Sequence, residues 1–193
     1  VVYLGGLGAR GEGSDHLRSR HEVGDLLADH LPTVELRASL VLGEGSTSYE
    51  LLRQIVDRLP RGPGGIVPAP VALDTMTQPV DVREAVDHLV AALELPPGQY
   101  DIGAASPLTF GALMEAQAAA TGGDLVVQPV LPAAPEAFTP VADLLTDQSG
   151  TTIRVLFASA STETIVADDR RATLPGRGPT PIEETLAWLA REG

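Results

Sequence analysis

Short apolar segments alternate along this chain with longer segments that have helical periodicity. Four of the short segments have the character of strands: Val1–Leu4, Thr33–Val41, Gln99–Ile102 and Leu125–Val130. Short apolar runs of this kind are typical of strands that are buried on both faces, as in a parallel sheet. Because parallel strands need helical crossovers, the pattern predicts the α/β class, with helices covering a parallel sheet.

Five segments between and after these strands have helical patterns. Their expected bounds are Asp15–His30, a start at Thr47, Val80 or Asp81 to Leu95, Thr109–Thr121 and Thr180–Arg191. Local signals mark some of the ends. Thr47–Glu50 has the spacing of a capping box, and Pro181 directly follows a threonine that suits an N-cap. The apolar residues of Ile153–Val166 fit either a helix or a strand.

The apolar residues of two helices define the faces that we expect to point at the core. In the first helix these residues are Leu17, Val23, Leu26, Leu27 and Leu31. In the third helix they are Val82, Ala85, Val86, Leu89 and Leu93.

The glycine loop after the first strand permits two interpretations. Gly6–Gly11 has the spacing G-x-G-x-x-G, which cradles a pyrophosphate in dinucleotide-binding units. That mechanism requires the third glycine where the helix packs on the strand, and an acidic residue that ends the next strand. Gly13 and Ser14 delay the helix, and Glu35 falls within its strand. The pattern therefore favours the alternative, a glycine-rich active-site loop that follows a later strand of the sheet.

Composition excludes several kinds of chemistry. All 13 basic residues are arginine, and the chain has no cysteine, which excludes Schiff-base and P-loop lysines, cysteine nucleophiles, thiolate metal sites and disulfides. The net charge of -13 is unfavourable for nucleic acid and for anionic membranes. The four histidines lack metal-ligand spacing, so no metal site is expected. Without a signal-peptide pattern or an apolar run of about 18 residues, we expect a cytoplasmic protein.

Six segments together resemble a known family in their order and spacing. They are VVYLGGLG, HLRSRHEVGDLL, LRASLVLGEGSTSYELLRQIVDRLP, TQPVDVREAVDHLVAAL, YDIGAASPLTF and GPTPIEETLAWL. The series resembles an atypical subgroup of the short-chain dehydrogenase/reductase superfamily, related to the extended NAD(P)-dependent epimerases and dehydratases. The resemblance runs across nearly the whole chain and is weakest over residues 131–168.

The register of this resemblance predicts a partial Rossmann fold. It implies that Val1–Leu4 is a strand of the second half of a doubly wound parallel sheet. The glycine-rich first half, about a hundred residues, would then lie upstream of this chain. We expect residues 1–105 to be the later part of the NAD(P)-binding domain, with a lobe insertion near 46–70. Residues 106–193 are expected to form an α+β substrate-side lobe with the last helix, within one structural unit.

The resemblance also implies which residues form the site. Gly5 and Gly6 stand where catalytic members carry a serine or threonine, and His16 and Arg20 stand at the places of the Tyr-x-x-x-Lys pair. Imidazole titrates at about pH 6.5, so His16 is the candidate general acid, while Arg20 could hold the nicotinamide ribose as the lysine does. Gly5, Gly6, Arg20 and the pair Ala38-Ser39 are the candidate cofactor neighbours. The competing interpretations are a polar helix face and a packed strand end.

Three functions are compatible with these substitutions. The first is an NAD(P)-binding, oxidoreductase-like protein whose serine, tyrosine and lysine are replaced. The second is a non-catalytic, dinucleotide-dependent sensor or scaffold, and the third is an epimerase or dehydratase activity built from other residues. The expected partners are a nicotinamide cofactor and a small molecule. We expect weak or absent cofactor binding by this chain alone, because the helix that would hold the pyrophosphate is upstream. An apolar edge strand left free would also favour a homodimer.

Overall fold

A three-stranded parallel sheet forms one half of the molecule. The structure is a computed structural model that describes residues 1–11, 13–60, 62–131, 147, 162–175 and 178–192. Strands β1 (Val2–Gly6), β2 (Val34–Ala38) and β7 (Gly98–Ile102) pair in the order β1-β2-β7. Gly6 lies opposite Ala38, and Ala38 lies opposite Ile102, so the carboxyl ends of all three strands meet at one edge. Among the described residues, β1 pairs on one side only.

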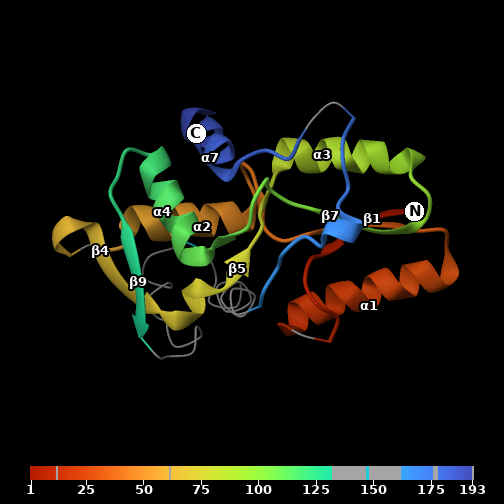
Figure 1. Cartoon of the computed structure of the whole chain (residues 1–193), viewed down its shortest axis with the longest axis horizontal. Coiled ribbons are helices and arrows are strands. Elements are labelled where there is room, and N and C mark those ends of the chain that lie inside the picture. The colour runs from red at the N-terminus through yellow and green to blue at the C-terminus, as the bar shows by residue number, and fades with distance from the viewer. Residues whose placement is uncertain (12, 61, 132–146, 148–161, 176–177, 193) are drawn as a thin grey trace.

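Two helices cover opposite faces of this sheet (Figure 1). Alternate residues of β2 separate the two faces, as the pleat requires. Leu36 and Ala38 pack with Ala85 of α3 (Val82–Ala91) in one apolar cluster. Glu35, which points the other way, lies against α1 (Asp15–His30). The predicted parallel sheet between helices is therefore confirmed.

The remaining elements form a second group of helices and short strands. The strand pairs are β3 (Val41–Leu42) with β6 (Val80–Asp81), β4 (Ile66–Pro70) with β9 (Val126–Leu131), both parallel, and β5 (Met76–Thr77) with β8 (Leu108–Thr109), antiparallel. The helices are α2 (Thr47–Arg58), α4 (Phe110–Ala120) and α7 (Ile182–Glu192). The 3-10 turns η1 (Pro63–Gly65) and η2 (Val71–Asp74) also belong to this group, whereas η3 (Ala92–Glu94) and η5 (Asp168–Arg170) lie beside the three-stranded sheet. No helix among the described residues has the length and apolar character needed to cross a bilayer.

The second core joins parts of the chain that are distant in sequence. Leu42 and Tyr49 pack with Leu113 of α4 and Leu186 of α7 in one buried cluster. This cluster takes residues from both sides of position 105, and the division into residues 1–105 and 106–193 stays a prediction.

Several element boundaries differ from the sequence-based expectation. The last helix begins at Ile182 rather than at Thr180, and the third helix ends at Ala91 rather than at Leu95. The expected strand Thr33–Val41 is divided, because Ala38 ends β2 and the chain then continues into β3 beside β6. Asp81 ends β6 and caps α3, since its side chain accepts the N–H of Arg83 at 2.7 Å. The third helix therefore begins at Val82. Of the ambiguous stretch, residues 153–161 lie outside the described part, and Thr164 forms a parallel bridge with Thr77.

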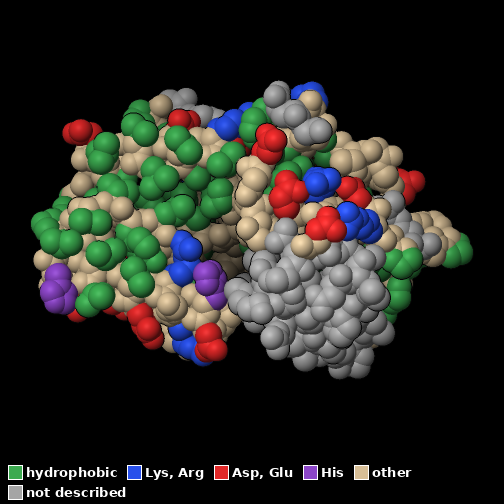
Figure 2. All heavy atoms as spheres, turned by 180° about the vertical axis from the view of Figure 1, so that it is seen from behind, with side chains coloured by type: hydrophobic (Ala, Val, Ile, Leu, Met, Phe, Trp, Pro, Cys, Tyr) green, Lys and Arg blue, Asp and Glu red, His purple; other side chains and the backbone are tan. Residues whose placement is uncertain are grey.

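The apolar faces predicted for α1 and α3 are wrong in part. Leu26 is 61% exposed on α1, and Val86 and Leu93 are 52% and 72% exposed on and just after α3. Polar or small residues take the inward positions instead, notably His21 and Gly24 on α1. Figure 2 shows hydrophobic side chains gathered on the surface of this half of the molecule.

Glu35 explains why α1 turns a glycine toward the sheet. Its carboxylate is buried between Gly24 on α1 and Gly5 on β1, where an added Cβ would lie 2.5 Å and 2.4 Å from Oε1. The other oxygen accepts from Gln99 at 2.9 Å and lies 3.5 Å from Arg10. The two glycines therefore provide the space that a buried carboxylate occupies between helix and sheet.

Gly24→Ala is expected to lower the free energy of unfolding by about 1–3 kcal/mol, because the new methyl group overlaps the Glu35 carboxylate. Urea unfolding followed by circular dichroism measures the change. In a Glu35→Ala background the same substitution should instead stabilise the chain by about 1 kcal/mol, since alanine has the higher helix propensity. Equal losses in both backgrounds would contradict this explanation.

Candidate functional site

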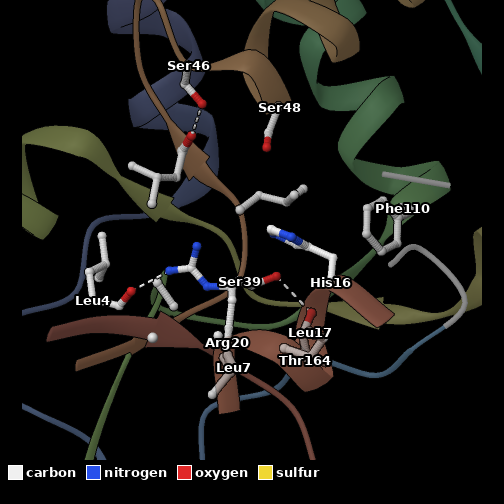
Figure 3. Close-up of a pocket in the computed structure, with 15 residues that line it drawn as sticks. Leu4, Leu7, His16, Leu17, Arg20, Ser39, Ser46, Ser48, Phe110 and Thr164 are labelled. Atoms are coloured by element: carbon white, nitrogen blue, oxygen red, sulfur yellow. Dashed lines mark hydrogen bonds between the residues drawn. The ribbon is translucent and has the colours of Figure 1, made fainter. Parts of the chain in front are cut away.

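A pocket of about 220 Å³ opens where β1 and β2 end and α1 and α2 begin (Figure 3). Its walls come from both halves of the molecule. The lining residues are Leu4, Gly5, Gly6, Leu7, His16, Leu17, Arg20, Ala38, Ser39, Leu40, Val41, Ser46, Ser48, Phe110 and Thr164. All six residues that the sequence nominates, Gly5, Gly6, His16, Arg20, Ala38 and Ser39, line this one pocket.

Gly5 and Gly6 bring the end of β1 to the pocket without side chains. At Gly5 the space for a side chain is filled by the Glu35 carboxylate. At Gly6 an added Cβ would lie 2.4 Å from Leu17 and 3.4 Å from Arg20. A serine at either place would require one of these side chains to move, so the packing is adapted to the absence of a hydroxyl group.

His16 and Arg20 lie one turn apart on α1. The helix starts just before them, where the Ser14 hydroxyl accepts the N–H of Leu17 at 3.2 Å. Because residues four positions apart share a helix face, both side chains reach the pocket (Figure 3). Arg20 donates a hydrogen bond from Nη2 to the carbonyl oxygen of Leu4 on β1. This bond orients the guanidinium across the pocket, whereas His16 is exposed to solvent.

Ser39 belongs to a triangle of hydroxyl groups beside the pocket. Its Oγ lies 2.8 Å from Oγ1 of Thr77 and 2.7 Å from Oγ1 of Thr164, and these two threonine oxygens are 3.1 Å apart. The triangle joins the end of β2 to a segment 125 residues later. It places Thr164 in the pocket wall. The sequence did not predict this position, because the apolar residues of 153–166 fit a helix and a strand equally well.

The start of α2 contributes two more residues that sequence reasoning missed, Ser46 and Ser48. The expected capping box begins one residue too late, because the N-cap is Ser46 rather than Thr47. Ser46 makes no side-chain cap bond and donates its hydroxyl to the Val41 carbonyl oxygen at 2.7 Å instead. The capping-box pattern was the signal for a helix start here, but it does not reveal which site that start faces.

The Gly6–Gly11 loop lacks two features of a pyrophosphate cradle. An added Cβ at Gly11 would meet nothing within 4 Å, so the third glycine is not at a close helix-to-strand contact. Glu35 is 3% exposed in the middle of β2 and cannot reach a ribose at the end of the strand. The loop instead carries Leu7, which is buried and donates its N–H to the Ala38 carbonyl oxygen at 2.9 Å. Within the described residues, no cluster of His, Asp and Glu is arranged to hold a metal ion.

No family model matches the sequence, and a search of curated proteins finds no match. Solved structures do match. The triphenylmethane reductase of Citrobacter sp. is 20% identical with a TM-score of 0.66, over 98% of this chain and 64% of that chain. A nucleoside-diphosphate-sugar epimerase from Staphylococcus aureus is 13% identical with a TM-score of 0.68, over 96% and 63%. An NADPH-dependent quinone oxidoreductase from Escherichia coli is 16% identical with a TM-score of 0.66, over 97% and 66%.

These similarities confirm the predicted fold class, a partial Rossmann-like α/β fold. The chain spans slightly less than two thirds of the length of each of the three proteins. One of the matching structures, that of the Citrobacter reductase, is a complex with NADP(H).

Proposed function

We propose that this chain is the C-terminal part of a cytoplasmic, NAD(P)-dependent, oxidoreductase-like protein and that its pocket receives the nicotinamide end of the cofactor. The observation that carries the proposal is that all six nominated residues line one pocket at the carboxyl ends of β1 and β2. In open α/β sheets, ligands bind outside the carboxyl ends of the strands. The three similar structures, whose names are those of reductases and an epimerase, support the same class.

The pocket suits one end of a dinucleotide but not the whole of it. Arg20 presents donors that would hold the nicotinamide ribose, and Ala38 and Ser39 would lie beside the ring. The described residues offer no cradle for the pyrophosphate, since Gly6–Gly11 lacks the close contact that such a loop makes. We therefore assign the pyrophosphate to an upstream βαβ unit that pairs with β1 along the edge where no described strand lies.

The surface around β1 supports this arrangement. The exposed apolar residues Leu26 on α1 and Val90 on α3 lie on the two helices that flank the sheet, whose β1 edge has no partner strand among the described residues. An upstream half-sheet with its own helices would cover the edge and both apolar faces, whereas a strand from a second copy would cover the edge alone. In this proposal the upstream half-sheet covers the β1 edge and the exposed apolar side chains of α1 and α3. A homodimer that pairs through β1 is the alternative.

In the proposed reaction the cofactor, when bound, supplies the hydride. His16 is the residue of this chain that would give a proton to the substrate oxygen, because its imidazole reaches the pocket and remains open to solvent for reprotonation. Arg20 positions the ribose and is itself held by the Leu4 carbonyl oxygen.

The upstream-extended protein is expected to bind NADPH or NADH saturably, while the 193-residue chain shows weak or no binding, because the pyrophosphate site is upstream. Cofactor fluorescence titration of both proteins measures this difference. The absence of a saturable signal in the extended protein would remove the proposal.

His16→Gln in the extended protein is expected to lower kcat/KM by about a hundredfold, the usual contribution of a positioned general acid, without weakening cofactor binding. Turnover of a panel of ketones and quinones is the assay. His30→Gln, on the exposed end of the same helix, is the matched control and should leave turnover unchanged.

A sensor or scaffold is the second candidate function, and one observation favours it. The packing of Glu35 and Leu17 against Gly5 and Gly6 leaves no room for the missing hydroxyl group. Saturable cofactor binding without turnover of any panel substrate would select this function over the reductase. An epimerase or dehydratase activity stays the third alternative.

A further inference from the structure

The ionisable side chains that line the pocket are all basic. Arg20 and His16 are the two, and no Asp or Glu is among the fifteen described lining residues. This is a local exception, since the chain carries 26 acidic residues and a net charge of -13. A concave site with basic groups and no carboxylate attracts negative charge from an otherwise repulsive surface. The lining therefore points to an anionic ligand.

Arg20 is also a cation without a carboxylate partner among the described residues. Arg10, Arg37 and Arg53, by contrast, each form ion pairs with Asp or Glu. A guanidinium has five N–H donors in a planar fork, which matches a carboxylate. The bond from Nη2 to the Leu4 carbonyl oxygen uses one donor and fixes the plane of the group. The remaining donors are already oriented before a ligand enters the pocket.

The start of α2 adds to the positive character of the same pocket. The N–H groups of a first helical turn favour an anion, and a side-chain cap usually satisfies them. At α2 the hydroxyl group of the N-cap residue Ser46 donates to the Val41 carbonyl oxygen and makes no hydrogen bond to the N–H groups of the helix. Ser48, in the first turn, lines the pocket with its hydroxyl group.

Apolar side chains also line the pocket, and its volume limits the size of the ligand. Leu40 and Phe110 line the pocket, whose volume is about 220 Å³. In Figure 3, Phe110 lies beyond His16 from Arg20. A cavity of about 150 Å³ accommodates benzene, so this pocket has room for one ring with a carboxylate. A polyanion would leave its further charges against the apolar side chains.

We propose that the pocket binds a small monocarboxylate with an apolar or aromatic body, and that Arg20 and His16 bind the carboxylate. This proposal goes beyond the proposed function: it assigns a ligand to the pocket when no cofactor is bound, because the pocket has room for one ring and Arg20 would hold either the carboxylate or the nicotinamide ribose. The body of the acid lies against Leu40 and Phe110, and the Ser48 hydroxyl group is a further donor in the pocket.

Benzoate and its neutral analogue benzamide test the proposal on the 193-residue chain without cofactor. Imidazole NMR resonances of the four histidines are followed during titration. Benzoate should shift His16 saturably and leave His30 and His88 unchanged, and benzamide should bind at least about tenfold more weakly because it lacks the charge. Equal affinity for the two compounds, no saturable shift, or shifts confined to histidines outside the pocket would overturn the proposal.

Arg20→Gln should weaken benzoate binding about tenfold or more. Arg20→Lys should weaken it less, because lysine keeps the positive charge but lacks the planar, two-pronged donor geometry of the guanidinium. Arg18→Gln is the matched control on the same helix, since Arg18 is exposed and pairs with Asp15. Unchanged affinity in Arg20→Gln would overturn the proposal. If Arg20→Gln does not fold, the Arg20→Lys variant and the comparison of benzoate with benzamide decide the matter.

The absence of cofactor from this assay keeps the two proposals separable. Benzoate binding through Arg20 with no cofactor binding by the extended protein would retain the anion site and remove the reductase. Cofactor binding without benzoate binding would support the proposed function and contradict the proposal of a monocarboxylate ligand.

Discussion

Asp101→Ala is expected to lower the free energy of unfolding by about 3–5 kcal/mol, because it leaves the buried Arg37 guanidinium without a counter-charge. Asp101 has no exposed surface, and Arg37 is 5% exposed. Oδ1 of Asp101 accepts from Nε of Arg37 at 2.7 Å and lies 2.6 Å from Nη2. Urea unfolding followed by circular dichroism measures the loss.

The same carboxylate also holds a distant segment against the sheet. Its second oxygen accepts the N–H of Ala167 at 3.1 Å, and the backbone carbonyl of Asp101 accepts the N–H of Ala172 at 2.9 Å. Thr164, in the pocket wall, lies just before this attachment. We therefore expect Asp101→Ala to perturb the pocket as well as the stability of the chain.

Two variants separate the buried charge from other causes. The double variant Arg37→Leu/Asp101→Leu should recover most of the stability, because replacing both charges by apolar groups leaves neither uncompensated. Arg18→Ala, which breaks an exposed pair with Asp15, should change stability little. A loss below about 1 kcal/mol in Asp101→Ala would show that Arg37 finds another partner or water.

The Arg37 pair shows why part of this structure could not be predicted from the sequence. Arg37 and Asp101 are 64 positions apart, and nothing local to either residue marks them as partners. Helix positions, in contrast, follow from local signals: Asp15–His30 has the predicted bounds, and α2 begins at the predicted Thr47. Local capping and periodicity therefore define the elements, while the long-range pairs depend on the sheet register.

The inward faces of the helices are a second place where periodicity failed. The pattern for α1 assumes that its leucines meet an apolar sheet, but the sheet presents Glu35 at this place. A helix that packs on a buried carboxylate needs a glycine there, so Gly24 faces inward and Leu26 faces outward. The six nominated site residues nevertheless meet in one pocket, because strand ends and helix starts place them independently of these faces.

Glu84→Ala is expected to lower the free energy of unfolding by about 3 kcal/mol, because it removes the buried carboxylate that contacts His88 and leaves the N–H of Thr180 without its acceptor. Glu84 and His88 are 2% and 5% exposed on α3. Oε2 of Glu84 accepts the N–H of Thr180 at 2.9 Å, and Oε1 lies 3.6 Å from Nε2 of His88. Thr180 leads into α7, so the carboxylate fixes the entry of the last helix.

The pH dependence of stability separates the contribution of the Glu84 charge from the contribution of the packing of its side chain. Burial raises the pKa of Glu84, but hydrogen bonds from His88 and Thr180 outweigh burial and hold the pKa below its ordinary value of 4.5. Because the folded-state pKa is the lower one, this stabilisation is complete above about pH 4.5 and is lost as pH falls through the folded-state pKa. Burial also raises the pKa of Asp81, but hydrogen bonds from Arg83 outweigh burial and lower the pKa. Asp81 therefore contributes to the same loss of stability at low pH.

Glu84→Gln keeps an oxygen for the Thr180 N–H and removes the titrating group. At neutral pH it should therefore lose less stability than Glu84→Ala, and below pH 4.5 its stability should fall less steeply than that of the parent chain. Unfolding free energies measured at a series of pH values for the three proteins give both comparisons. If the decrease in stability at low pH were equally steep in Glu84→Gln, Glu84 would be protonated to the same extent in the folded and unfolded states, which would contradict its lowered pKa.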